Sequence, residues 1–134
     1  MNIIAQYIIV LLSYLALDAV WLGIASRGVY RAQIGHLMSE SVNWGAAAIF
    51  YALFAAGVVY FVVQPAVAES TMRAALFAAF TRGALLGFLA YGAYDFTNFA
   101  TLKNWPLSIT LIDLAWGTFV IAAASVIATF FARM

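Results

Sequence analysis

The sequence predicts an all-α integral membrane protein, an antiparallel bundle of four transmembrane helices. Of its 134 residues, 67% are hydrophobic and only 8% are charged, and the mean hydropathy is +1.03. A soluble fold could not cover so much apolar surface, so the bilayer must be the solvent. The apolar residues also form four separate segments of about 20 residues or more, the length that crosses the hydrocarbon core as a helix. Short connections then place neighbouring helices antiparallel.

A single domain, residues 1–134, accounts for the whole chain, and its spans are expected at about 3–25, 44–64, 72–94 and 107–131. The first is interpreted as a retained span rather than a signal peptide, because it lacks a basic beginning and Asp18 interrupts it. Pro65 is expected to end the second span, since proline lacks a backbone donor. Pro106 stands near the first turn of the fourth span, where proline is tolerated.

The connection between the first two spans has a pattern of its own. Tyr30, Ile34, Leu37 and Met38 fall on one helical face. A short helix lying in the membrane interface has this spacing. An ordinary polar loop is the alternative, and the sequence leaves both open.

Composition excludes several classes of function. The formal net charge of +1 argues against a nucleic-acid partner. The absence of cysteine removes disulfides, thiolate metal sites and a cysteine nucleophile. A single histidine, His36, removes the usual zinc spacings. We therefore assign no catalytic residue and no metal site, and the cofactor stays unknown. The bilayer is the one partner that composition predicts.

Four spans place both termini on one side of the membrane and the aromatic residues mainly on the other. Trp21, Trp44 and Trp105 lie near that second side. An aromatic belt normally marks both interfaces, so the imbalance favours a further role for these rings. The basic residues are divided almost evenly and leave the orientation open.

Ionisable residues inside the spans are the strongest functional signal. Arg82 lies near the middle of the third span, where an arginine costs roughly 2.5 to 3.5 kcal/mol. Asp18 and Asp113 lie in the first and fourth spans, each with a tryptophan three residues later, Trp21 and Trp116. Residues at that spacing share a helical face, and the two helices run in opposite directions, as in an inverted repeat. We predict that Arg82 pairs with Asp18, Asp113 or both.

The richest polar stretch, Tyr94–Pro106, follows the third span directly. Capping by Asn104 and anchoring by Lys103 explain part of its polarity. We expect the rest to form the rim of a polar pocket in the half of the bundle that contains both aspartates. The candidate ligand-binding residues are Asp18, Trp21, Arg82, Tyr91, Tyr94, Asp95, Thr97, Asn98, Lys103, Trp105, Asp113 and Trp116.

The third span also contains a G-x-x-x-G pattern, Gly83 to Gly87. Small residues at this spacing let two helices approach closely. The partner is either another helix of the same chain or a second copy, so a homo-oligomer through Gly83 and Gly87 is one expectation.

Three stretches carry a resemblance to a known family. LDAVWLG, AIFYALFAAGVVYFVVQPA and GALLGFLAYGAYDFTNFATLKNWPLSITLIDLAWG together resemble a bacterial family of membrane proteins, the domain of unknown function numbered 2177. The most specific part is the run Tyr-Asp-x-Thr-Asn-x-Ala-Thr-Leu-Lys-x-Trp-Pro, from Tyr94 to Pro106. The resemblance implies a four-span protein of the bacterial inner membrane, without an agreed activity and associated with fatty-acid-modifying enzymes.

The function predicted first is binding or transport of a small amphiphile, with Arg82 holding a carboxylate group in its planar fork. The first alternative is a subunit of a lipid-modifying enzyme, in which an aspartate acts as a general base. The second alternative is a helix-packing partner in a membrane complex. Intrinsic catalysis is disfavoured, because no nucleophile, redox centre or metal-ligand set is evident.

Overall fold

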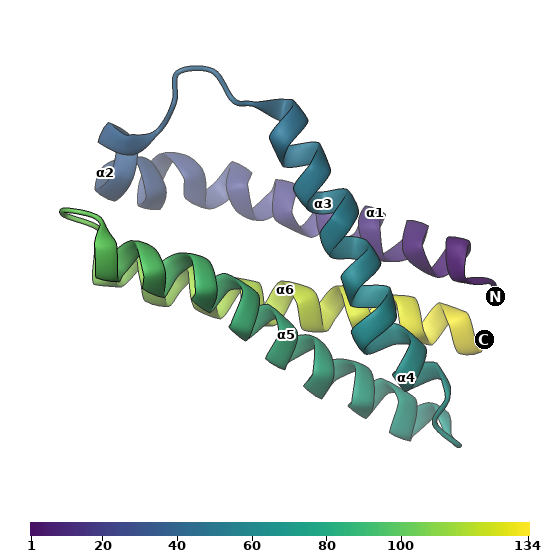
Figure 1. The fold of residues 1–134 in the computed structure, drawn as a ribbon. Helices are drawn as coiled ribbons and strands as arrows, with labels where there is room; N and C mark the ends of the chain where they lie inside the picture. Colours follow the sequence, from purple (N-terminus) through teal and green to yellow (C-terminus); the bar gives the residue numbers. More distant parts are fainter.

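The computed structural model describes residues 1–134 and consists of long helices that run alternately up and down the bundle (Figure 1). Four of its helical stretches are long and apolar enough to cross a membrane. Both termini lie at one end of the bundle, as an even number of spans requires (Figure 1). The predicted all-α, four-helix fold class is therefore confirmed. The main helices are α1 (Ile3–Ala25), α3 (Trp44–Val58), α5 (Met72–Thr101) and α6 (Leu107–Arg133).

The first helical stretch is longer than the sequence suggested. The side chain of Asn2 caps α1 by accepting a hydrogen bond from the backbone N–H of Ala5, at 2.8 Å. At its other end α1 continues through one π-helical turn, Ser26–Tyr30, into α2 (Arg31–Ile34) and a 3₁₀ turn, Gly35–Leu37. The expected separate interfacial helix is thus a continuation of the first span.

The second helical stretch does not end at Pro65. After α3, a π-helical turn, Val59–Val63, leads into α4 (Gln64–Val67), and Pro65 occupies the first turn of α4. A π-helical turn is wider than an α-helical turn, so it accommodates the proline ring. It also lets the helix continue although proline has no backbone N–H to donate. The predicted end of this span was wrong by about one turn for that reason.

The third span ends at Thr101, so the polar stretch that follows Tyr94 is mostly helical. The hydroxyls of Thr97 and Thr101 donate to backbone carbonyls of the turn that precedes each of them. Only residues 102–106 form the connection to α6. Asn104 does not cap α6 as predicted, because it adopts a left-handed conformation with φ of 60° inside this turn.

Close packing of small residues joins α5 to α6. A Cβ atom added at Gly87 would lie 2.2 Å from the carbonyl oxygen of Gly117, and one added at Gly83 would lie 2.9 Å from the carbonyl oxygen of Ile121. The G-x-x-x-G face is therefore occupied by α6 of the same chain. Oligomerisation stays a prediction, and a second copy would have to use another face.

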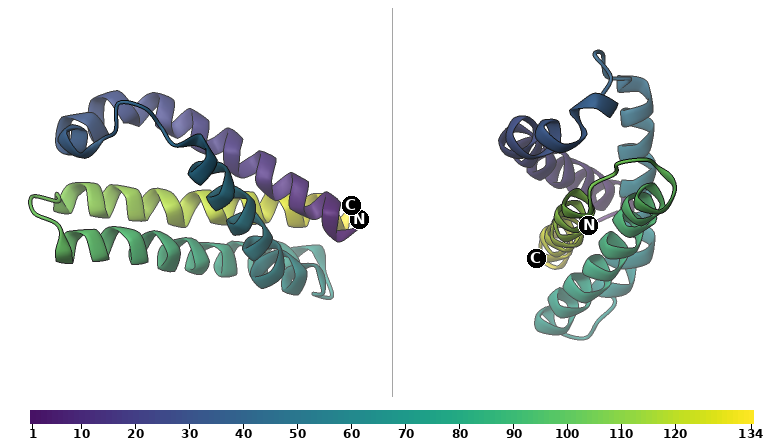
Figure 2. Two further views of the ribbon diagram at one scale, coloured as in Figure 1. Left: turned by 45° about the horizontal axis from the view of Figure 1, so that its top comes forward. Right: turned by 90° about the vertical axis from the view of Figure 1, so that its left-hand side faces the viewer.

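The core is concentrated at the end of the bundle that holds the termini. Mostly small and branched side chains of the first, second and fourth spans fill it: Val10, Tyr14, Ala55, Val58, Val59, Val62, Val63, Val120, Ile121, Ala124 and Ala128. Of α3 itself, only Ala55 and Val58 are buried. Figures 1 and 2 show the cause, because α3 crosses the bundle obliquely and its N-terminal half stands away from α5 and α6.

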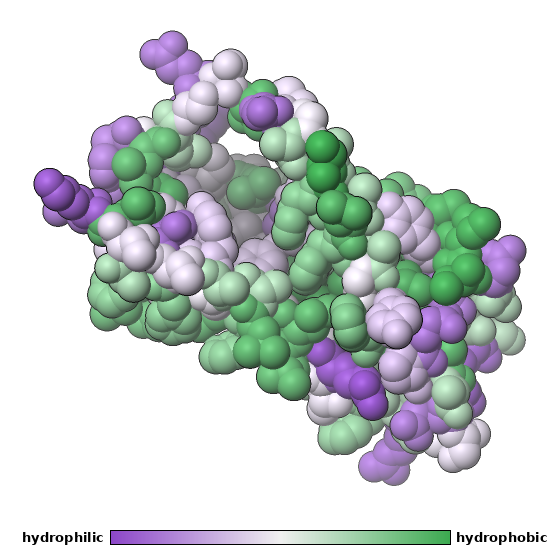
Figure 3. All heavy atoms as spheres, viewed as in Figure 1, coloured by the Kyte–Doolittle hydropathy of each residue, from purple (hydrophilic) through white to green (hydrophobic).

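The outer surface is apolar over most of its area, as a membrane-spanning bundle requires. Ile24, Trp44 and Phe77 are 75%, 75% and 69% exposed, and hydrophobic residues cover much of the face in Figure 3. At the end with the termini, Arg133 donates to the backbone carbonyls of Val67 and Glu69, at 2.8 and 2.6 Å. This contact fastens the last turn of α6 to the turn between α4 and α5.

We predict that Gly87→Ala lowers the free energy of unfolding by about 1–3 kcal/mol, because the added methyl group overpacks a contact that the helix backbones cannot widen cheaply. Thermal unfolding of purified protein in a mild detergent measures the change. Gly57→Ala is the matched control, since a Cβ there meets nothing within 4 Å. Equal stability of Gly87→Ala and the wild type would contradict the close approach of α5 and α6.

Candidate functional site

A cavity lies in the half of the bundle away from the termini, where α1, α2, α5 and α6 meet. Its volume is about 350 Å³. Figure 3 shows a hollow on this face of the molecule, between α3 and the helices α2 and α5. The cavity is lined by Asp18, Trp21, Leu22, Tyr30, Ile34, Tyr51, Tyr91, Tyr94, Asp95, Trp105, Ile109, Asp113 and Trp116.

Asp18 is a buried carboxylate on α1 that two other helices supply with hydrogen bonds. The indole N–H of Trp116 on α6 donates to one of its oxygens at 2.9 Å. The phenol of Tyr51 on α3 donates to the other. A carboxylate removed from water needs such donors, and these bonds tie α1 to both neighbours at one level of the bundle.

Asp113 on α6 receives its hydrogen bond from the segment that follows α1, whereas Asp18 on α1 receives one from α6. The hydroxyl of Tyr30 donates to Asp113 at 2.8 Å and accepts from the indole N–H of Trp21 at 3.1 Å. The indoles of Trp21 and Trp116 stack with ring centroids 4.6 Å apart and 8° between their planes. Each Asp–Trp pair thus interacts with the pair on the antiparallel helix, directly at Asp18 and through a tyrosine at Asp113.

Asp95 is different from the other two carboxylates. It lies on α5, in the part of the helix that was expected to be a loop, and it is 0% exposed. Neither of its carboxyl oxygens has a hydrogen-bond partner. It lines the same cavity as Asp113 and lies next to it. Buried polar groups are almost always satisfied in folded proteins, so this carboxyl group is the exception in the site.

A second cavity, of about 360 Å³, adjoins the first between α3 and α5. The two share Tyr51, Tyr91, Tyr94 and Asp113 in their walls. The remaining walls of the second cavity are apolar apart from one hydroxyl and come from Tyr14, Phe50 and Ala90. The hydroxyl of Tyr14 is hydrogen-bonded to that of Tyr91. A chamber that holds three carboxyl groups therefore lies beside a largely apolar one.

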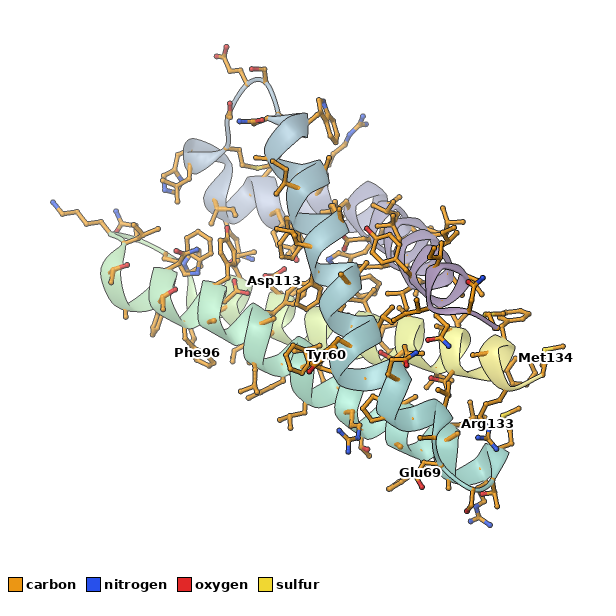
Figure 4. All side chains as sticks on the ribbon, turned by 45° about the vertical axis from the view of Figure 1, so that its right-hand side comes forward. Tyr60, Glu69, Phe96, Asp113, Arg133 and Met134 are labelled. Atoms are coloured by element: carbon orange, nitrogen blue, oxygen red, sulfur yellow. The ribbon has the colours of Figure 1, made fainter.

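The structure brings together eight of the twelve candidate residues that the sequence indicated. Those that line the first cavity are Asp18, Trp21, Tyr91, Tyr94, Asp95, Trp105, Asp113 and Trp116. Figure 4 shows Asp113 among the helices, whereas Phe96, which is 45% exposed, lies on the outside of α5.

The other four candidates lie outside the cavity, and the predicted pairing of Arg82 was wrong. Arg82 is exposed, and the carboxylates with which it was expected to pair accept hydrogen bonds from tyrosine and tryptophan instead. Thr97 and Lys103 are exposed, and Asn98 lines neither cavity.

Tyr14, Tyr30 and Tyr51 are the polar contributors that sequence reasoning missed. Each lies within an apolar helical stretch, and each hydroxyl is hydrogen-bonded to a side chain of another helix. A buried tyrosine hydroxyl usually finds a protein partner. That requirement, applied to every tyrosine in the spans, would have indicated that these residues face the acidic ones.

The chemistry available in the cavity is that of carboxylates and aromatic rings. No group of three or more histidine, cysteine, aspartate or glutamate side chains is placed to hold a metal ion. The cavity wall carries no lysine, arginine or histidine. The site is therefore suited to a ligand that has hydrogen-bond donors or a positive charge. It has no basic side chain that could bind an anion.

We predict that Tyr51→Phe lowers the free energy of unfolding by about 1–3 kcal/mol, because it removes one of the two donors to the buried Asp18. In an Asp18→Asn background the same substitution should cost less, so the two effects do not add. Tyr60→Phe, in the π-helical turn Val59–Val63 that follows α3 and 71% exposed, is the control and should leave thermal unfolding unchanged. Additive effects of Tyr51→Phe and Asp18→Asn would reject the interaction.

Comparison with known proteins supports the architecture. No curated protein and no solved structure is significantly similar to the chain. One family model, described as a predicted membrane protein, matches residues 3–130 and thus nearly the whole chain. This match confirms the family that the sequence resembles. The chain belongs to the DUF2177 family of predicted membrane proteins.

Proposed function

We propose that this multi-pass membrane protein binds a small amphiphile, with the polar end in the acidic cavity and the apolar end in the adjoining chamber. The observation that carries the proposal is Asp95, a fully buried carboxyl group in a cavity wall that lies beside the carboxyl group of Asp113 and receives no hydrogen bond from a tyrosine, a tryptophan or the backbone. A guest with a hydrogen-bond donor satisfies it. Ligand sites commonly combine apolar walls with a few such polar groups.

The two adjoining chambers support an amphiphile rather than a wholly polar ligand. The first cavity holds three carboxyl groups, and the second is walled largely by Phe50, Ala90 and tyrosine rings. Phe50 and Tyr94 are 47% and 57% exposed, so the apolar chamber borders the outer, membrane-facing surface. A chain that extends from the acids through this chamber reaches lipid.

Binding is also consistent with the rigidity of the polar chamber. The hydrogen bonds of Asp18 and Asp113 and the stacked indoles fix its walls before any ligand arrives. A preformed site lowers the entropic cost of binding. Transport would require in addition that the cavity open to both sides of the membrane, so binding is the function that these contacts support best.

We predict that Ala90→Trp abolishes or weakens binding at least tenfold, because the indole fills the apolar chamber. Native mass spectrometry of protein purified in a mild detergent should detect a small amphiphile on the wild type and lose it with this variant. Ala93→Trp is the matched control, since Ala93 is exposed on the same helix and lines neither cavity.

Two results would overturn the proposal. One is a wild-type protein that carries no amphiphile after gentle purification and takes up none when octyl-chain probes are added. The other is equal loss of a bound amphiphile with Ala90→Trp and Ala93→Trp, which would place the amphiphile on the outer surface.

A further inference from the structure

The geometry points to a positively charged head group, an alkylammonium, on the amphiphile that binds here. This inference rests on the proposed function and adds the charge of the ligand. It differs from the expectation that the sequence alone gave, because Arg82 was then assumed to hold a carboxylate.

The charges of the wall are all of one sign. Three carboxyl groups face the cavity, and no basic side chain does. Arg82, the nearest candidate by sequence, is exposed and lines neither chamber. A carboxylate that leaves water without a counter-charge is costly, and a bound cation supplies the counter-charge that the protein lacks. An anionic head group would add to the repulsion.

The hydrogen-bond donors of the wall are mostly committed to protein partners. The indole N–H groups of Trp21, Trp116 and Trp105 donate to Tyr30, Asp18 and Thr110. The phenols of Tyr30 and Tyr51 donate to Asp113 and Asp18. An anionic head group needs donors, and few are left. Two groups remain: the hydroxyls of Tyr14 and Tyr91 bond to each other and leave one phenolic proton uncommitted, and the carboxyl group of Asp95 receives no hydrogen bond from these donors.

The aromatic rings of the wall offer the other feature that attracts cations. The indoles of Trp21 and Trp116 each cover one face of the other, and both residues line the cavity together with Trp105, Tyr91 and Tyr94. Tyr94 and Trp105 meet edge to face, with ring centroids 5.9 Å apart. Cations bind to ring faces, more strongly where water is excluded, and aromatic cages recognise quaternary ammonium groups in this way.

An organic cation fits better than a metal ion. The acids are not placed as a metal-ligand group, and a cavity of about 350 Å³ is large for a bare ion. Drug-sized ligands occupy sites of roughly 300–1,000 Å³. An alkylammonium group therefore matches the volume, the sign of the charge and the aromatic walls at once. Its source is either an amine-bearing lipid or a free organic cation.

The test compares three probes that have a saturated chain of seven or eight carbons and differ in the head group: octylammonium, whose N–H groups can donate to Asp95, octanoate and octanol. Trp44 is 75% exposed and outside the cavity, so Trp44→Phe makes the fluorescence report only on the three cavity indoles. The cation should bind at least tenfold more tightly than the anion or the alcohol. Asp95→Asn should remove most of that preference, while Glu69→Gln, which deletes an exposed acid in the turn before α5, should keep it.

The outcomes separate this inference from the proposed function. If octanoate or octanol binds as tightly as the cation, with Ala90→Trp blocking all three, the protein binds amphiphiles and the charge assignment is overturned. If no probe binds, both proposals fail. The ranking on the wild type decides the matter even if Asp95→Asn does not fold. Native mass spectrometry from nanodiscs containing phosphatidylethanolamine distinguishes the sources. An amine lipid that stays bound when the free cation is added indicates a lipid ligand, and an amine lipid that the free cation displaces indicates a free organic cation. Both results support the charge assignment.

Discussion

Carboxylates that lie within a membrane-spanning bundle must obtain their hydrogen bonds from the protein, and this requirement organises half of the structure. Asp18 and Asp113 obtain theirs from tyrosine and tryptophan side chains of other helical segments. Each such bond fixes the rotation and the level of two helices at once, because it is short, directional and costly to break where water is absent. The walls of the cavity are therefore also the contacts that align α1, α3 and α6.

The two ends of the bundle are packed by different types of side chain, and this difference produces the cavity. Toward the termini, valine, alanine and glycine allow the helices to approach until little space is left. Toward the other end, indole and phenol rings hold α1 and α6 apart, and α3 diverges. Asp95 stands at this wider end on α5, which packs against α6 through glycines and bonds to α1 through the Tyr91–Tyr14 pair, one turn before Asp95. That arrangement explains why the third acid stays unpaired while the other two are satisfied.

Hydropathy identified the four spans and their first residues, since Ile3, Trp44, Met72 and Leu107 all begin helices as predicted. The ends were less predictable, because α5 stops where its hydrogen bonds stop and not where its apolar residues do. The spacing of three residues between aspartate and tryptophan correctly indicated that the two Asp–Trp pairs face each other. It gave no information on which side of α5 Arg82 lies. Gly83 packs against α6, and adjacent residues on a helix are rotated by about 100°. That rotation places Arg82 on the outside, where its long side chain can extend toward head groups. One sequence does not reveal which of two adjacent residues faces inward.

The oblique course of α3 has a consequence for how affinity would be observed. Phe50 and Tyr94 border the apolar chamber and are themselves exposed on the membrane-facing side, so an amphiphile that enters there comes from the hydrocarbon phase. Its effective concentration is then set by partitioning, and each additional methylene enriches it in the bilayer by about 0.8 kcal/mol. Apparent dissociation constants expressed per litre of buffer would fall steadily with chain length, whereas those expressed as mole fraction of lipid would stay level once the chamber is filled.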